Sequence, residues 1–120
     1  MLNSYQIKKA DIPYSKEESK AFILCYCAQI DFTLSLEELE YMKSKTNSDN
    51  ITKAYKEICK SNDFQIIQRI QTLVDNYWRT EVDKNNLLKD IWDLFLTDGK
   101  CNQMERNLYR GLNQLFASNY

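Results

Sequence analysis

Several residue types are scarce in this 120-residue chain, and each shortage excludes a class of protein. It contains no histidine, which removes the most frequent general base and the most frequent metal ligand. With only two glycines and one proline, the chain cannot be collagen-like and is not typical of a turn-rich all-β protein. The longest apolar run, residues 21–28, is much shorter than the roughly 20 residues that cross a bilayer, so we expect no membrane span.

The chain also lacks an excess of positive or negative charge, because its 16 Lys and Arg residues balance its 17 Asp and Glu residues. Nucleic-acid-binding domains concentrate positive charge, so we expect no nucleic-acid partner. The length is that of one domain, which can form a core without disulfides. The first residues lack the apolar stretch of a signal peptide, which predicts a cytoplasmic location and reduced cysteines.

The four cysteines do not form a zinc-binding pattern. Cys25 and Cys27 are separated by one residue, no C-x-x-C spacing exists, and no histidine is available. Cys25, Cys27 and Cys59 fall in apolar helical patterns and are expected to be inert core residues. Cys101 follows Lys100 in a predicted loop, and it is the cysteine that we expect solvent to reach.

The remaining pattern predicts an all-α fold, a compact bundle of about six helices. Capping-box patterns open three of them, at Ser15–Glu18, Ser35–Glu38 and Asn102–Glu105. Breaks at 47–50, 61–63 and 98–99 separate the others. Apolar residues then recur at helical spacing in each segment, most regularly at Ile66, Ile67, Ile70, Leu73, Val74, Tyr77 and Trp78.

The chain contains an apparent internal duplication with a shift of 67 residues. Residues 22–30 are apolar except for Gln29, which predicts a helix buried on all sides, and a second apolar helix ends at 98. Each is followed by an aspartate, then a capping residue, then a glutamate; these are Asp31, Ser35 and Glu38 in the first copy and Asp98, Asn102 and Glu105 in the second. The duplication predicts two helical hairpins, at about 16–46 and 83–117, related by a pseudo-two-fold with their two buried helices central. Residues 1–14 are then a loosely ordered leader, and 15–120 form a single domain.

This doubled motif resembles the TerB-like family, which includes tellurite-resistance proteins and a region of certain co-chaperones. Asp98-Gly99 fits the family pattern, whereas Phe32 stands where the family usually has glycine. The resemblance covers about residues 16–117. It implies a non-enzymatic module of a bacterial stress-response or tellurite-resistance system, acting through contacts with a protein partner and with possible weak homo-oligomerisation.

Four acidic residues, Asp31, Glu38, Asp98 and Glu105, form the candidate site. Oxygen ligands of this kind suit Mg²⁺ or Ca²⁺, and no other cofactor is expected. In the structural alternative, the two glutamates cap their helices and the two aspartates accept backbone hydrogen bonds within the loops. An EF-hand is excluded because Gln103 stands at the sixth loop position, where glycine is required. Paired acids could also serve a hydrolase, the third alternative.

Charge is distributed unevenly along the chain. Residues 31–40 and 75–98 are acidic, whereas residues 43–60 carry five lysines against Asp49 and Glu57. Such stretches are usually solvated helix faces, although an acidic face near the duplicated loops could meet cations or a basic partner.

Overall fold

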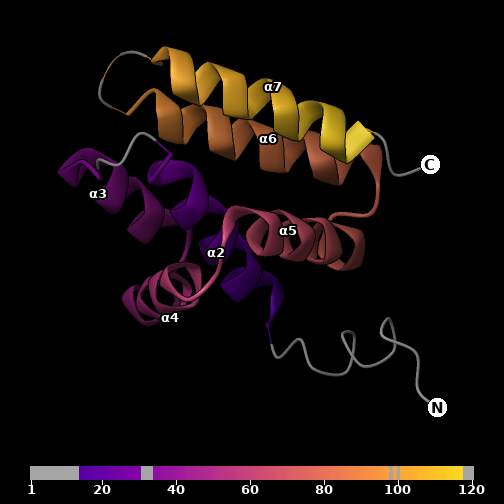
Figure 1. Ribbon diagram of the computed structural model, residues 1–120. Coiled ribbons are helices and arrows are strands. Elements are labelled where there is room, and N and C mark those ends of the chain that lie inside the picture. The colour runs from indigo at the N-terminus through magenta and orange to yellow at the C-terminus, as the bar shows by residue number, and fades with distance from the viewer. Residues whose placement is uncertain (1–13, 31–33, 98, 100, 118–120) are drawn as a thin grey trace.

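The computed structural model describes residues 14–30, 34–97, 99 and 101–117. Within these ranges the chain forms six α-helices and no strand, which confirms the all-α prediction. With the labels of Figure 1, they are α2 (Lys16–Ala28), α3 (Leu36–Lys45), α4 (Ser48–Cys59), α5 (Asp63–Tyr77), α6 (Glu81–Phe95) and α7 (Gln103–Ala117). None of the helices in the described part combines the length and apolarity needed to cross a bilayer.

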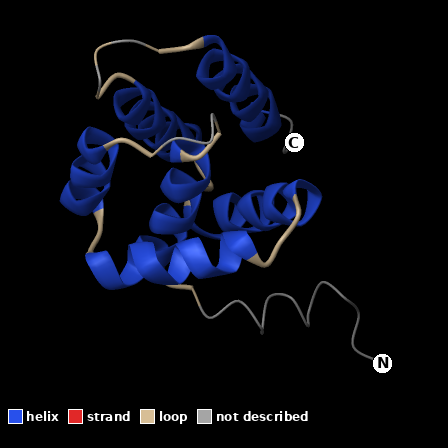
Figure 2. Cartoon of the chain, turned by 60° about the vertical axis from the view of Figure 1, so that its left-hand side comes forward, coloured by secondary structure: helices blue, strands red, loops and turns tan. Residues whose placement is uncertain are grey.

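Helix α2 is at the centre of the molecule. It contacts α3, α4, α5 and α6, and every side chain from Ala21 to Ala28 is buried. The α6–α7 hairpin lies on one side of α2 and α4 on the other, and α5 lies beside α2, where it also contacts α7 (Figures 1 and 2). A helix without a polar face needs neighbours all round it, so the apolar run at 21–28 determines this arrangement.

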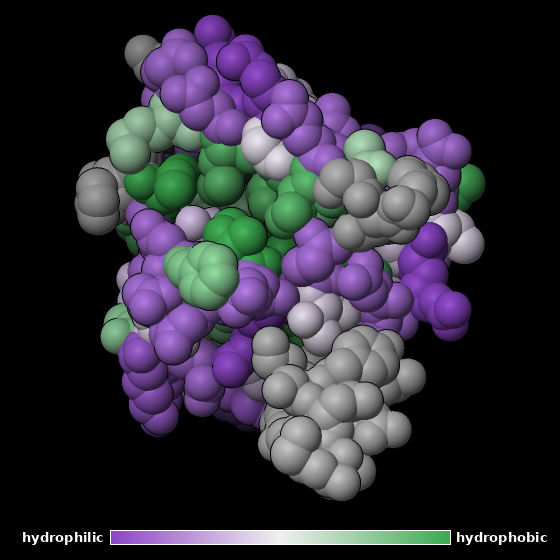
Figure 3. Space-filling model, turned by 45° about the vertical axis from the view of Figure 1, so that its right-hand side comes forward, coloured by the Kyte–Doolittle hydropathy of each residue, from purple (hydrophilic) through white to green (hydrophobic). Residues whose placement is uncertain are grey.

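Helix α6 packs between α2 and α7 and also contacts α3. Its inner face is apolar and buried, comprising Leu87, Leu88, Ile91, Leu94 and Phe95. Its opposite face is exposed at Asn85, Asn86 and Lys89, so α6 is amphipathic where α2 is not. Figure 3 shows apolar side chains gathered beneath this hairpin, on the side of α5, within a mostly hydrophilic surface.

Reciprocal hydrogen bonds confirm the three predicted capping boxes, at Ser15–Glu18, Ser35–Glu38 and Asn102–Glu105. Two further boxes, which the sequence reading missed, open α5 and α6 with Asn62–Gln65 and Thr80–Asp83. Both depart from the usual Ser/Thr-x-x-Glu pattern, with Asn and Gln in one box and Asp in place of Glu in the other. Their side-chain oxygens nevertheless accept the same backbone hydrogen bonds at the start of the helix.

Helix α4 begins inside the segment 47–50, which the sequence analysis assigned to a break. The side chain of Asn47 accepts a hydrogen bond from the amide of Asn50 at 2.8 Å, and the helix starts at Ser48. Asparagine is a poor interior helix residue but a strong N-cap, so Asn47 starts α4 directly after Thr46, the C-cap of α3.

Tyr14, the last residue of the predicted leader, belongs to the core. It is buried, and its ring lies 5.9 Å from that of Phe22. The hydroxyl of Tyr77 donates a hydrogen bond to the Tyr14 carbonyl oxygen. The packed domain therefore begins no later than Tyr14.

Candidate functional site

Two of the four predicted site residues, Glu38 and Glu105, occupy equivalent positions at the starts of α3 and α7. Oε1 of Glu38 accepts a hydrogen bond from the Ser35 amide at 3.0 Å, and Oε1 of Glu105 accepts one from the Asn102 amide at 2.9 Å. Both side chains are buried, with 5% and 3% of their surface exposed. These contacts confirm the capping role that the sequence predicted for both glutamates.

The other two predicted site residues, Asp31 and Asp98, lie outside the described residues. Among the residues that the structure does describe, no three His, Cys, Asp or Glu side chains gather as metal ligands. A cation site at the elbows, meaning the loops 29–35 and 96–102, therefore depends on Asp31 and Asp98. The Mg²⁺ or Ca²⁺ site stays a prediction.

Gly99 gives the second elbow its backbone shape. Its φ is +98°, a region that L side chains rarely adopt, and its amide donates to the carbonyl oxygen of Leu96 at 3.0 Å. Gly99 lies three residues beyond Leu96, the C-cap of α6, so its positive φ shapes the loop that follows the helix.

Gly99→Ala should destabilise the protein by about 1 kcal/mol, measured by urea denaturation. A Cβ at this position meets nothing within 4 Å, so the cost comes from the backbone alone. Gly111→Ala is the matched control, because Gly111 lies within α7 and its Cβ would also meet open space. This substitution should stabilise by about 0.5–1 kcal/mol, and equal effects at both positions would contradict the backbone argument.

The structure reverses two of the cysteine predictions. Cys101 is buried and belongs to the core cluster, whereas Cys59 at the end of α4 is exposed. The prediction for Cys101 assumed that a loop residue beside a lysine is open to solvent, but its side chain turns inward. Cys25 and Cys27 are buried as predicted, and burial raises the pKa of the Cys25 thiol to about 12 and also raises that of Cys27.

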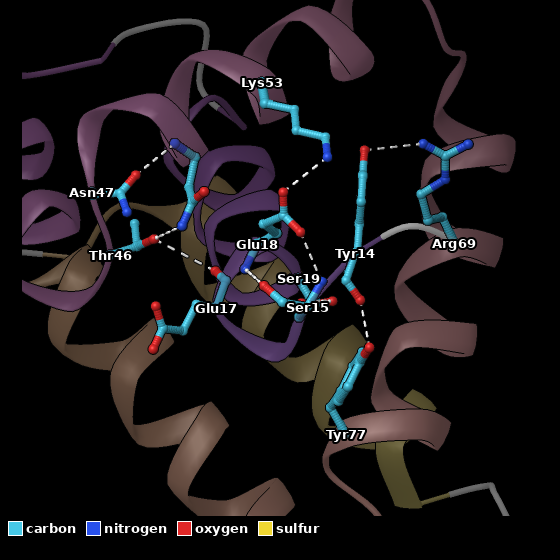
Figure 4. A network of polar contacts seen from close by, with 11 residues as sticks. Tyr14, Ser15, Glu17, Glu18, Ser19, Thr46, Asn47, Lys53, Arg69 and Tyr77 are labelled. Atoms are coloured by element: carbon cyan, nitrogen blue, oxygen red, sulfur yellow. Dashed lines mark hydrogen bonds and ion pairs between the residues drawn. The ribbon is translucent and has the colours of Figure 1, made fainter. Parts of the chain in front are cut away.

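A polar network connects the start of α2 to α4 (Figure 4). Oε1 of Glu18 accepts a hydrogen bond from the Ser15 amide at 2.8 Å, and its Oε2 pairs with Nζ of Lys53 at 2.9 Å. The Lys53 ammonium also lies 4.9 Å from the centre of the Tyr14 ring. One carboxylate therefore serves both a helix cap and an interhelical ion pair.

The same network continues to α5 through Arg69. Its Nη1 lies 3.4 Å from the hydroxyl of Tyr14 and 3.4 Å from Oε2 of Glu57. Its guanidinium lies 5.8 Å from the centre of the Tyr14 ring, on which Lys53 also packs. These contacts join α2, α4 and α5, so the network explains the packing of this side of the molecule.

The Glu18–Lys53 pair gives stability a predictable pH dependence. Hydrogen bonds from Lys53 and from Ser15 lower the pKa of Glu18 in the folded state. A lowered pKa contributes stability that is present above the unfolded value, near 4.5, and is lost as the pH falls through the folded pKa.

Glu18→Gln keeps the capping box but removes the charge, so it should cost about 0.5 kcal/mol at neutral pH, with the pair partly exposed. The cost should disappear under acid conditions, which urea titrations across the acid range would measure. Glu17→Gln removes the adjacent exposed carboxylate and is the control; it should leave the pH dependence unchanged. A cost for Glu18→Gln that is constant with pH would contradict the assignment.

The outer surface of α4 carries a hollow of about 540 Å³, which we call the α4 hollow. Its described lining is Ile51, Thr52, Tyr55, Lys56, Cys59 and Lys60. These residues form two rows along the helix at four-residue spacing, an apolar row of 51, 55 and 59 and a row of 52, 56 and 60. A smaller depression of about 300 Å³ lies on the other side of the second row. The row with Lys56 and Lys60 is thus a ridge between two hollows.

The lysines of α4 differ in their partners. Lys53 pairs with Glu18, as above, whereas Lys56 and Lys60 are exposed and form no ion pair within the described part of the chain. The sequence contained a signal for this surface, namely the positive charge of residues 43–60, but no motif there marks a binding site.

No protein-family model, no curated protein and no solved structure matches this chain. Its function is therefore inferred from its own residues and their geometry.

Proposed function

We propose that this chain is a non-enzymatic module of the TerB-like type, which acts in the cytoplasm within a bacterial stress-response or tellurite-resistance system by binding another protein. The observation that carries the proposal is the pair of matched elbows. At each elbow a helix of the central layer leads to a second helix whose N3 glutamate is buried and bonded to the N-cap amide. The family resemblance rests on these two glutamates together with Asp31 and Asp98, each seven residues before its glutamate.

Burial at positions 67 residues apart supports the duplication. The pairs Leu24 and Ile91, Cys27 and Leu94, and Ala28 and Phe95 are all buried. The two hairpins, α2–α3 and α6–α7, each pack internally, and α2 contacts α6. Burial at these matched positions is expected if the inner faces of two duplicated hairpins pack together, although α6 has an exposed face that α2 lacks.

The α4 hollow supports a role in protein contacts. It lies on a helix that packs against the core through Ala54 and Ile58, with Ile51 at the inner edge of the hollow. Its outward lysines lack ion-pair partners within the described residues, so they are available to a partner.

Affinity purification of the tagged chain from tellurite-stressed cells tests this proposal. We expect a reproducible protein partner, and we expect loss of the gene to increase tellurite sensitivity. Purifications that yield no reproducible partner, together with unchanged tellurite growth, would contradict it.

A second candidate is binding of a divalent cation at the elbows. It is favoured by the two buried glutamates at matched positions, each following an aspartate of the duplicated motif. In this case calorimetry with Ca²⁺, Mg²⁺ or Mn²⁺ should show heat at millimolar metal, and the Tm should rise through preferential binding to the folded state.

Asp98→Asn should abolish that heat, whereas Asp49→Asn, at an exposed position on α4, should preserve it. Absence of heat and of any Tm shift would exclude the cation candidate. Binding that survives Asp98→Asn would show that the ligands lie elsewhere.

A further inference from the structure

We propose that the α4 hollow binds an acidic helical segment of the partner protein. An apolar side chain of that segment covers Tyr55 and Cys59, and two carboxylates one helical turn apart reach Lys56 and Lys60. The inference rests on the proposed function and specifies the chemistry of the partner.

The shape of the hollow suits an apolar side chain. Ile51 is buried and closes the inner end of the apolar row, Tyr55 is half-buried, and Cys59 is exposed. A volume of about 540 Å³ accommodates a leucine or an aromatic ring with its neighbours. Covering these groups removes apolar surface from water, and this hydrophobic contribution favours binding independently of the charges.

The charges beside the hollow select an acidic occupant. Lys56 and Lys60 border it, and neither has an ion-pair partner among the described residues. The first 13 residues of this chain carry Lys8 and Lys9 against Asp11, so their own charge does not complement the two lysines. A separate acidic partner therefore fits better than the N-terminal segment.

The spacing of the lysines selects the arrangement of the carboxylates. Lys56, in the last turn of α4, and Lys60, its C-cap residue, are four residues apart, which corresponds to about 6 Å along the helix axis. Carboxylates four residues apart on a partner helix have the same spacing. Because exposed ion pairs are individually weak and screened by salt, we expect modest affinity that falls as ionic strength rises.

A labelled helical peptide with two glutamates four residues apart and a leucine on the adjoining face is the direct probe. Fluorescence anisotropy should show saturable binding to the full chain, and the same peptide with glutamines should bind at least about fivefold more weakly. Cys59 supplies a second readout, because the other three cysteines are buried and a thiol reagent should reach Cys59 first. The bound peptide should slow the labelling of Cys59.

Charge reversal locates the site. Lys56→Glu with Lys60→Glu should weaken the acidic peptide about tenfold or more. The matched control is Lys43→Glu with Arg106→Glu, which makes the same change in net charge at exposed positions on α3 and α7 and should leave binding within about twofold.

Equal losses in both double variants, or peptide binding without protection of Cys59, would overturn the proposal. So would tighter binding of a single-stranded oligonucleotide than of the peptide, or self-association that buries Cys59, because these results assign the surface to nucleic acid or to a second copy.

The partner recovered by affinity purification separates this inference from the proposed function. If the Lys56→Glu, Lys60→Glu chain still captures the same partner as the unmodified chain, the interaction function stands and the α4 hollow is not its site. If the unmodified chain captures no partner and the acidic peptide does bind, the surface is real and the proposed function fails.

Discussion

Leu24→Ala is expected to lower the free energy of unfolding by about 3 kcal/mol, a large part of the stability of a domain of this size. Leu24 is fully buried at the centre of α2, the helix that contacts four others. Removing its isobutyl group leaves a cavity that surrounding helices cannot fill without moving against one another. Urea denaturation should show a lower midpoint with an unchanged m-value.

The control is the same substitution at an exposed position. Leu36 begins α3 with 68% of its surface exposed, so Leu36→Ala should change stability by less than about 0.5 kcal/mol. Comparable losses at the two positions would contradict the central placement of α2.

Glu105→Ala is expected to destabilise by about 1–2 kcal/mol, because it removes the buried carboxylate that accepts a hydrogen bond from the N-cap amide of α7. Glu105 is 3% exposed and bonds to the amide of Asn102. Glu105→Gln retains an acceptor oxygen at N3 and should recover a substantial part of this loss, since glutamine also completes a capping box. Thermal denaturation of the two variants measures the difference.

The glutamine variant also separates capping from cation binding. If Glu105 serves only as a cap, Glu105→Gln should leave the response to added metal unchanged, whereas a ligand role predicts that the response disappears. The same pair of substitutions at Glu38 should behave alike if the elbows are equivalent. Loss of stability in the glutamine variant equal to that in the alanine variant would contradict the capping account.

The part of the candidate site that the sequence predicted correctly is its local hydrogen bonding. Ser35–Glu38 and Asn102–Glu105 are pairs separated by three residues, and both form the reciprocal contacts expected of capping boxes. Whether Asp31 and Asp98 approach the glutamates depends on how the two elbows are placed, which no local pattern specifies.

The α4 hollow, by contrast, could not be predicted from local sequence patterns. The sequence contains all of its residues at helical spacing, yet Lys53 and Lys56 look alike there. Only the packing of α2 against α4 distinguishes them, because it brings Glu18 to Lys53 and leaves Lys56 facing outward. A charge count along the chain identified the region but not the available lysines.

The sequence by itself determined the helices, the starts of α2, α3 and α7 and the buried character of α2, because these features arise from contacts within a few residues and from hydrophobic periodicity. Only the tertiary structure decided that Cys59 is exposed while Cys101 is buried, and that Tyr14 belongs to the core. Burial of a single side chain depends on which neighbouring helix covers it, and that neighbour is distant in the sequence.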